Sequence, residues 1–176
     1  MYFDKNFPTI PYDSVGQGTF KDVKNILRRV ALRTKVKTNS LLYDTYDVKE
    51  GETPEIIADK LYGDPQLHWV IMIVNNIVDR YHGWPMFGNQ FLDYVNEKYS
   101  NPSATHHYEI AQSSGDTSVK INIGTDNTDY PTATAITNFE FEQTDQDNKR
   151  KIRLLDPRFT DDFVADFKEL MKESII

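Results

Sequence analysis

The chain has 176 residues and no cysteine, which excludes disulfides, thiolate nucleophiles and zinc sites built on cysteine. Its net charge of −7 differs from the basic balance of most nucleic-acid-binding domains. The longest apolar run, residues 69–74, is far shorter than the roughly 18 residues of a membrane span, and the first residues lack the apolar core of a signal peptide. We therefore expect a soluble protein made in a cytoplasm, with no membrane association, built as one domain or a small module with extensions.

Residues 1–19 are predicted to form an extended N-terminal arm, because two prolines and two glycines oppose a helix there. Its apolar side chains Phe7, Ile10 and Tyr12 would be unusual in a purely solvated tail. The arm either packs on its own domain or grips a neighbouring subunit, and the sequence leaves both alternatives open.

Residues 20–33 are predicted to form an amphipathic helix, since apolar residues recur at the spacing i, i+3, i+4, i+7. Seven Lys or Arg and one Asp lie between Lys21 and Lys37, so this stretch carries +6 and the rest of the chain −13. A nucleic-acid contact is one explanation, but a solvated or protein-contacting helix face is favoured because the chain as a whole is acidic. The apolar positions are Val23, Ile26, Leu27 and Val30.

The most informative stretch, residues 46–76, predicts a short strand, a glycine turn and two closely spaced helices. Thr53–Pro54 supplies an N-cap and a proline at the first helical position, and Gly63 ends this helix in a left-handed conformation. Asp64–Pro65 repeats the start signal. The second helix is apolar on nearly all sides, so we expect it to be the central core element.

The rest of the chain predicts a third helix over about residues 88–99 and then a change to short alternating strands. A strand at 151–155 is expected to pair with residues 139–143, and Thr160 is expected to cap a final helix. The predicted fold class is α+β, in three segments: an extended arm (1–19), a small α-rich core with flanking helices (20–102), and an antiparallel β-meander with a C-terminal helix (103–176). The remaining expected strands are 106–112, 119–123 and 139–144.

No arrangement of residues predicts catalysis, a metal or a cofactor. His106 and His107 are adjacent, and adjacent side chains of a regular strand point to opposite faces, so they cannot share a metal unless the strand is broken. The carboxylates lie in turns and helix starts, where they have structural uses. Phosphate-binding glycine loops and the common hydrolase motifs are absent from the sequence. We therefore expect a protein that is not an enzyme and takes no small-molecule substrate.

The stretch from Val48 to Pro65 resembles a LysM module, whose pattern is strand, Gly-(Asp/Glu)-Thr turn, helix, Tyr-Gly, helix, strand. The resemblance implies a LysM-like core, and true LysM modules bind N-acetylglucosamine chains in grooves beside these turns. After the asparagine pair, however, the second strand of the pattern is replaced by Ile77–Met86 and a further helix. The matching residues are Gly51, Glu52, Thr53, Ile57, Ala58, Tyr62, Gly63, Asn75 and Asn76.

A longer stretch, with its centre at residues 62–84, resembles the baseplate wedge protein of contractile-tailed bacteriophages, which carries a LysM-like core. The likeness is strongest over residues 43–99, and Pro8–Pro11 and the last 25 residues or so are similar more loosely. The matching residues are Tyr62, Gly63, Asp64, Pro65, Leu67, Trp69, Val70, Asn75, Asn76, Gly83 and Trp84.

This resemblance implies a structural protein of the virion tail baseplate, assembled in the host cytoplasm. It would join wedge subunits to one another and to the hub region, with other wedge proteins and neighbouring wedges as partners. The alternative is a cell-wall glycan-binding module, and a hydrolase using scattered carboxylates is a more distant third. The candidate interface or groove residues are Phe7, Ile10, Tyr12, Gly51, Thr53, Tyr62, Gly63, Asp79, Tyr81 and Trp84.

Overall fold

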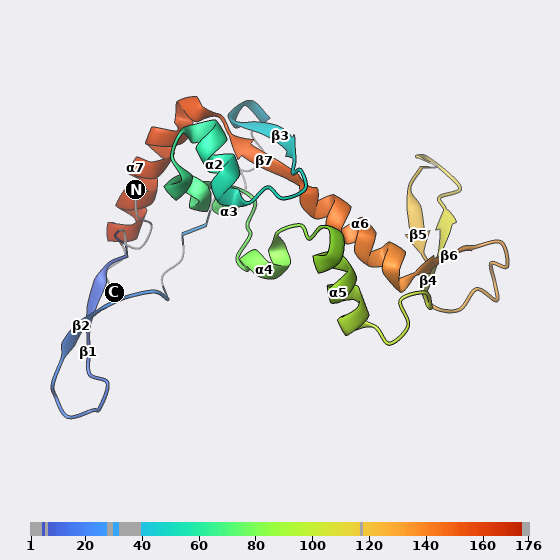
Figure 1. Cartoon of the computed structure of the whole chain (residues 1–176), viewed down its shortest axis with the longest axis horizontal. Helices are drawn as coiled ribbons and strands as arrows, with labels where there is room; N and C mark the ends of the chain where they lie inside the picture. Colours follow the sequence, from blue (N-terminus) through green and yellow to red (C-terminus); the bar gives the residue numbers. More distant parts are fainter. Residues whose placement is uncertain (1–4, 6, 28–29, 32–39, 117, 174–176) are drawn as a thin grey trace. The chain divides into compact units, whose positions relative to one another are not determined.

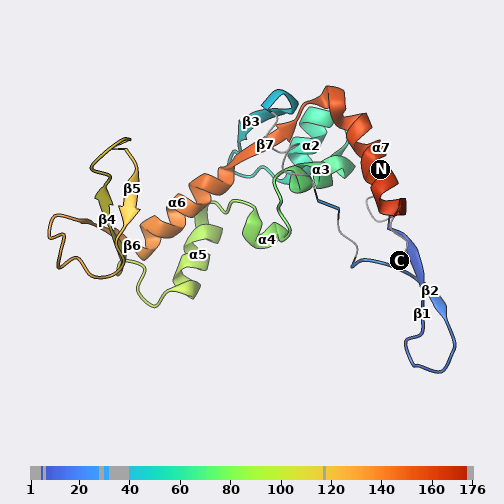
Figure 2. The same cartoon turned by 180° about the vertical axis from the view of Figure 1, so that it is seen from behind.

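The computed structural model describes residues 5, 7–27, 30–31, 40–116 and 118–173 (Figures 1 and 2). It divides into two compact units, one from the residues up to Gly83 together with those from Lys151 onward, the other from Trp84 to Arg150. The second unit is therefore an insertion in the sequence of the first. This division differs from the three consecutive segments expected from the sequence, whereas the α+β class is confirmed.

The first unit contains a two-stranded antiparallel sheet whose strands lie far apart in the chain. Strand β3 (Tyr43–Asp47) pairs with β7 (Lys151–Leu155), with Tyr43 opposite Leu155 and Asp47 opposite Lys151 (Figure 1). The prediction that residues 139–143 would pair with this strand is wrong, because they belong to a helix. The β7 strand instead completes a sheet begun before the insertion.

Two closely spaced helical segments follow β3, and their start and stop signals act as predicted. The Thr53 hydroxyl caps α2 (Pro54–Tyr62) by accepting from the Ile56 N–H at 3.4 Å, and Gly63 ends the helix at φ 70°. Asp64 accepts from the Gln66 N–H at 2.8 Å and starts the 3-10 turn that leads into α3 (His68–Val74).

Side chains from this helical pair close the outer edge of β7. The Asn75 amide donates to the Arg153 carbonyl oxygen and accepts from the Arg153 N–H, both at 2.8 Å, as a neighbouring strand would. It also donates to the Ile71 carbonyl oxygen at 2.8 Å. The Tyr62 hydroxyl donates to the Leu155 carbonyl oxygen at 3.1 Å, so α2 and α3 are both attached to β7.

The Asn75→Ala variant should lower the free energy of unfolding by about 1–2 kcal/mol, because it removes the partners of several backbone groups at once. Amide hydrogen exchange should become faster in β7 in particular. Asn148→Ala, at an exposed position of helix 138–150, should change stability by less than about 0.5 kcal/mol. Equal effects of the two substitutions would show that Asn75 does not hold the strand.

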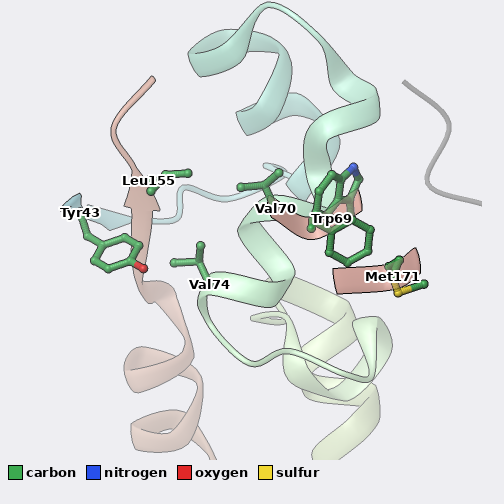
Figure 3. Packing of buried hydrophobic residues seen from close by; sticks show 7 residues of the cluster. Tyr43, Trp69, Val70, Val74, Leu155 and Met171 are labelled. Atoms are coloured by element: carbon green, nitrogen blue, oxygen red, sulfur yellow. The ribbon is translucent and has the colours of Figure 1, made fainter. Parts of the chain in front are cut away.

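The hydrophobic core of the first unit lies between α3, the sheet and the final helix α7 (Thr160–Glu173) (Figure 3). Trp69 is 3% exposed and its ring centroid lies 4.5 Å from that of Phe167. Because α3 buries several of its faces, the predicted role of this helix as the core element is confirmed. The cluster consists of Tyr43, Trp69, Val70, Val74, Leu155, Phe167 and Met171.

The N-terminal residues form a β-hairpin, so the helix predicted for residues 20–33 is wrong in its first part. Strand β1 (Thr9–Tyr12) pairs with β2 (Lys21–Lys24) in antiparallel fashion. The Asp13 carboxylate closes the loop by accepting from three N–H groups, those of Val15 at 3.1 Å, Gly16 at 2.8 Å and Gly18 at 2.6 Å. These hydrogen bonds stabilise the hairpin turn. The segment therefore forms a hairpin, although its apolar residues have the spacing of a helix. Residues 28–29 and 32–33 of the predicted helix lie outside the described residues.

The second unit combines two helices with a three-stranded antiparallel sheet. Helix α5 (Gly88–Lys98) confirms the predicted third helix. Strand β4 (Thr105–Ala111) lies between β5 (Lys120–Asn122) and β6 (Thr134–Thr137). The second helix is α6 (Asn138–Arg150).

A capping box explains why residues 138–150 are a helix and not the predicted strand. The Thr137 hydroxyl accepts from the Glu140 N–H at 3.2 Å, and the Glu140 carboxylate accepts from the Thr137 N–H at 2.8 Å. This reciprocal pair satisfies two backbone donors at the start of a helix. Helix α6 is polar overall and is supported by ion pairs such as Lys149 with Asp145 at 2.6 Å.

A buried carboxylate connects the two helices of the second unit. Glu142 of α6 is 2% exposed and accepts at 2.7 Å both from the Lys98 ammonium group at the end of α5 and from the Tyr99 hydroxyl. Burial alone would raise the pKa of Glu142, but these donors lower it below its usual value. Glu142 is therefore held as a charged group inside the unit.

Candidate interaction surfaces

Among the described residues, seven of the sixteen exposed large apolar side chains lie between Tyr12 and Leu41 in the first unit. Leu27 is 88% exposed and Ile26 is 76% exposed. The predicted helix would have buried both residues on one face, whereas the hairpin and the segment after it leave them in solvent. Exposed apolar side chains that lie close together in the chain are candidates for a protein contact. The exposed residues are Tyr12, Val15, Phe20, Val23, Ile26, Leu27 and Leu41.

The register of the hairpin sorts its side chains into two faces. Ile10 lies opposite Val23 and Tyr12 lies opposite Lys21, so these four share one face, because directly opposed residues point the same way. Tyr12, Lys21 and Val23 are exposed. This face therefore offers apolar and cationic groups together. We call residues 7–27 the N-terminal arm from here on.

An apolar groove lies where the N-terminal arm meets α3 and α7, with a volume of about 360 Å³. Its inner wall includes the buried residues Trp69, Phe167 and Met171, and its mouth includes the exposed residues Ile26 and Val78. All the residues that line it belong to the first unit. The other lining residues are Phe7, Val30, Ala31, His68, Met72, Ile73, Asn76 and Ile77.

The predicted interface residues of the arm have different surroundings. Phe7 is half-buried and packs against the hydrophobic cluster, so the base of the arm is anchored on its own unit. Ile10 is also half-buried, whereas Tyr12 is 55% exposed. The two alternatives for the arm thus apply to different parts of it: packing on the unit holds for Phe7, and contact with a neighbour stays a prediction for Tyr12.

Four further candidates shape the backbone of the first unit. Gly51 has φ 79°, a left-handed conformation that glycine adopts without strain, in the turn before α2. Thr53 and Gly63 begin and end that helix, and Tyr62 is bonded to β7. Each residue therefore has a structural use, and their part in an interface stays a prediction.

The last three candidates lie around α4 (Arg80–Gly83) and at the unit boundary. Asp79 accepts from the Tyr81 N–H at 2.8 Å and contacts His82 Nδ1 at 2.6 Å. Tyr81 is 78% exposed, whereas Trp84 is 8% exposed. Tyr81 is thus available for contact, and the Trp84 side chain is not offered to solvent.

Glu52 lies at the centre of an ionic cluster. The sequence identified this residue only as part of the Gly-Glu-Thr turn. Its carboxylate accepts from the Tyr46 hydroxyl at 2.8 Å, the Lys49 N–H at 3.0 Å and the Lys60 ammonium group at 2.7 Å. Burial would raise the pKa of Glu52, but the bonds from Lys60, Lys49 and Tyr46 outweigh it and lower the pKa to about 2. The cluster therefore fixes the turn between β3 and α2 while Glu52 is charged.

Acidification should weaken this turn. Because the pKa of Glu52 is lower in the folded chain than its ordinary value of 4.5, its stabilising contribution is complete above pH 4.5 and is lost as the pH falls toward 2. Glu52→Gln should remove that part of the pH dependence and lower stability at neutral pH. Urea titrations of both proteins between pH 7 and 2.5 test this, and parallel pH profiles would contradict it.

His106 and His107 meet although they are neighbours in a strand. The register of β4 and β6 shifts between Thr105 and His107, and this irregularity brings the two Nδ1 atoms to 2.8 Å. The rule that adjacent side chains point to opposite faces holds for a regular strand, and it does not apply here because the pairing of β4 with β6 is irregular at these residues. The His106 ring stacks on Phe141 of α6 at 3.9 Å, which ties the sheet to the helix. Among the described residues, no group of three or more His, Asp or Glu could hold a metal.

No helix in the described part of the chain is long and apolar enough to span a bilayer.

Two sequence comparisons define the relationships of this protein. A stretch of 98 residues is 31% identical to the baseplate wedge protein gp53 of Enterobacteria phage T4. The match covers 56% of this chain and 44% of that relative, so it spans less than half of the relative's length.

The second comparison covers more of the chain. The family described as base plate wedge protein 53 matches residues 3–115, which include the N-terminal arm, α2, α3, α5 and β4. The matched part comprises well over half of the 176 residues. The chain thus belongs to the base plate wedge protein 53 family.

Proposed function

We propose that this protein is a structural, non-enzymatic component of a contractile phage tail baseplate, where it joins wedge proteins to one another and to neighbouring proteins around the hub. Its site is the virion tail, and its assembly takes place in the host cytoplasm. Membership of the wedge protein family supports the baseplate role. The charged and polar clusters described above have structural uses, which accords with a role through contacts.

The observation that carries the joining role is the N-terminal arm. Its base is held by Phe7 on the hydrophobic cluster, while Tyr12, Ile26 and Leu27 remain exposed. Covering an exposed apolar surface with a partner protein removes it from water and so lowers the free energy of the assembly. A rigid core with such an arm suits a protein that connects others.

The core is proposed to be LysM-like, with β3, α2, α3 and β7 in the order strand, helix, helix, strand. The strand that the pattern requires after the second helix is supplied by β7, beyond the insertion. Asn75 and Tyr62 bind its outer edge. In this proposal, the LysM-like motif residues serve to build a scaffold.

Co-expression with the other wedge proteins of the same phage tests the proposed function. The full chain should co-purify with the assembled wedge, and Tyr12→Asp combined with Leu27→Asp should abolish co-purification while the melting temperature stays the same. Leu92→Asp combined with Tyr130→Asp, at exposed positions outside the arm, is the matched control and should co-purify. A wedge that forms equally well without this chain would refute the proposal. A calorimetric titration with chitooligosaccharide should show no heat, and binding there would favour the glycan alternative.

A further inference from the structure

We propose that His106 and His107 form a pH-sensitive contact that holds strand β4 to helix α6 at neutral pH and releases it when both rings take up a proton. These two residues, called the histidine pair below, lie in the second unit and have no part in the proposed function. The proposal concerns the chain by itself, so its test does not depend on whether the chain joins a wedge.

The histidine pair connects β4 to α6 through one aromatic side chain. The two Nδ1 atoms lie 2.8 Å apart, at the place where the pairing of β4 with β6 is irregular. The His106 ring stacks on the Phe141 ring of α6, with 3.9 Å between the centroids and 9° between the planes. The buried His107 ring meets the same Phe141 ring edge-on at 5.9 Å. Phe141 therefore contacts both histidines, and the position of each ring depends on the other.

The neighbours of the histidine pair assign its protons. An ionised carboxylate can only accept a hydrogen bond, and Glu109 Oε1 lies 3.1 Å from His107 Nε2, so this nitrogen carries a proton. A neutral imidazole has a single N–H group, which leaves His107 Nδ1 as an acceptor. The contact between the two Nδ1 atoms then requires His106 Nδ1 to be the donor. In the neutral pair, His106 Nε2 consequently carries no proton.

This arrangement accepts one additional proton and excludes a second. The first proton binds His106 Nε2, keeps the hydrogen bond between the Nδ1 atoms, and places an imidazolium over the face of Phe141, which is a favourable position for a cation. A second proton would have to bind His107 Nδ1. Two N–H groups and two positive charges would then face each other across 2.8 Å in place of a hydrogen bond. The closed pair therefore holds one proton fewer than two separated histidines.

The charged groups on the surrounding elements leave this conflict in place. Strand β6 carries no titratable side chain, and Lys120 of β5 lies opposite Ala111, four positions along β4 from His107. Glu109 contacts Nε2 of His107, so it stabilises a protonated ring without separating the two Nδ1 atoms. The other acidic groups on α6 and on the connection from β5 to β6 are Glu140, bonded to Thr137, Glu142, bonded to Lys98 and Tyr99, Asp145, paired with Lys149, Asp126, bonded to Thr128, and the exposed Asp129.

Acid should therefore open the histidine pair. As the pH falls, an equilibrium shifts toward the state that binds more protons, and the open pair binds one more than the closed pair. Free histidine side chains take up a proton at about pH 6.5. Below that pH the equilibrium constant for opening should rise about tenfold for each pH unit. The opening should stay local, because the Asn138 N–H and side-chain amide still donate to the Ala104 and Asn101 carbonyl oxygens at 3.0 Å, just before β4.

Long-range 1H–15N correlation of the histidine ring nitrogens in the full chain tests the proton assignment, and amide exchange in the same sample tests the opening. At about pH 7.5, His106 should carry its proton on Nδ1 and His107 on Nε2. Toward about pH 5, which is still above the range near pH 4 in which carboxylates take up protons, His106 should become an imidazolium while His107 Nδ1 stays bare in the closed pair. The amides of residues 106–109 should show the tenfold rise in opening per pH unit. The opposite tautomers, or two imidazolium rings without increased opening, would overturn the proposal.

His106→Phe separates the effect of the pair from that of a single histidine. Phenylalanine keeps an aromatic ring beside Phe141 but takes up no proton, so opening of β4 should no longer increase with acid. His82→Phe is the matched control, because His82 is an exposed histidine of the first unit, and it should keep the tenfold dependence. A dependence that persists in His106→Phe, or disappears in His82→Phe, would show that the histidine pair is not the sensor. The ring-nitrogen measurement uses the unmodified chain, so it decides the proposal even if His106→Phe does not fold.

Discussion

Replacing Trp69 with alanine should lower the free energy of unfolding by about 3–5 kcal/mol, the largest loss expected from a single substitution in this chain. Trp69 is 3% exposed and contacts both Phe167 and Phe163 of α7, with ring centroids 4.5 Å and 6.1 Å away. The substitution leaves a cavity between α3, α7 and the sheet that the surrounding helices can fill only in part. Urea unfolding followed by far-UV circular dichroism measures the loss.

Tyr81→Ala is the matched control for this substitution. Tyr81 is an aromatic residue of the same unit, but it is 78% exposed, so its removal should cost less than about 0.5 kcal/mol. Hydrogen exchange should increase in α3, α7 and β7 of the Trp69 variant alone. A loss below about 1 kcal/mol for Trp69→Ala would show that α3 is not the core element of the unit.

The second large effect is expected from Lys98→Met in the second unit. This variant keeps much of the side-chain volume but leaves the buried Glu142 carboxylate without its cation, with the Tyr99 hydroxyl as a remaining donor. Breaking a buried ion pair in this way costs about 3–5 kcal/mol when both partners are buried. Because Lys98 is 42% exposed at its side chain, we expect about 2–3 kcal/mol here.

The loss caused by Lys98→Met should shrink at acid pH, and this separates a charge effect from a packing effect. Without Lys98 the pKa of Glu142 rises, so protonation of Glu142 relieves the variant as the pH falls. Lys149→Met is the control, since the carboxylate of its partner Asp145 is 45% exposed and stays solvated without the cation. A deficit of Lys98→Met that is the same at pH 7 and pH 4 would contradict the assigned role of the ion pair.

Local signals in the sequence were sufficient for α2 and for the 3-10 turn that leads into α3. Thr53, Gly63 and Asp64 act through hydrogen bonds to residues a few positions away, so their effect can be predicted from spacing alone. The burial of α3 also followed from its composition, because a helix that is apolar on nearly all sides needs contacts on several sides. Membership of the wedge protein family was predicted from the motif residues between Tyr62 and Trp84.

Two wrong assignments had local signals that could have corrected them. The helix over residues 20–33 was predicted from the helical spacing of Val23, Ile26 and Leu27. That prediction overlooked Asp13, whose carboxylate and two following glycines indicate a tight turn between strands. The strand assigned to residues 139–144 overlooked the capping box of Thr137 and Glu140. In both places a side chain that satisfies backbone N–H groups decided the structure.

The candidate groove and the pairing of β3 with β7 could not be predicted from spacing. Both depend on segments that are distant in the chain, and a strand gives no local sign of which partner it will take. Glu52 and Glu142 are similar cases, because a carboxylate in sequence does not reveal how many donors converge on it. These features depend on contacts between distant parts of the chain.

Amide hydrogen exchange of the full chain, free and within the assembled wedge, tests most directly whether this protein acts through its N-terminal arm. We predict strong protection of the arm, residues 7–27, on assembly, with little change in the already buried α3. Unchanged exchange in the arm within a wedge that contains the chain would contradict the account.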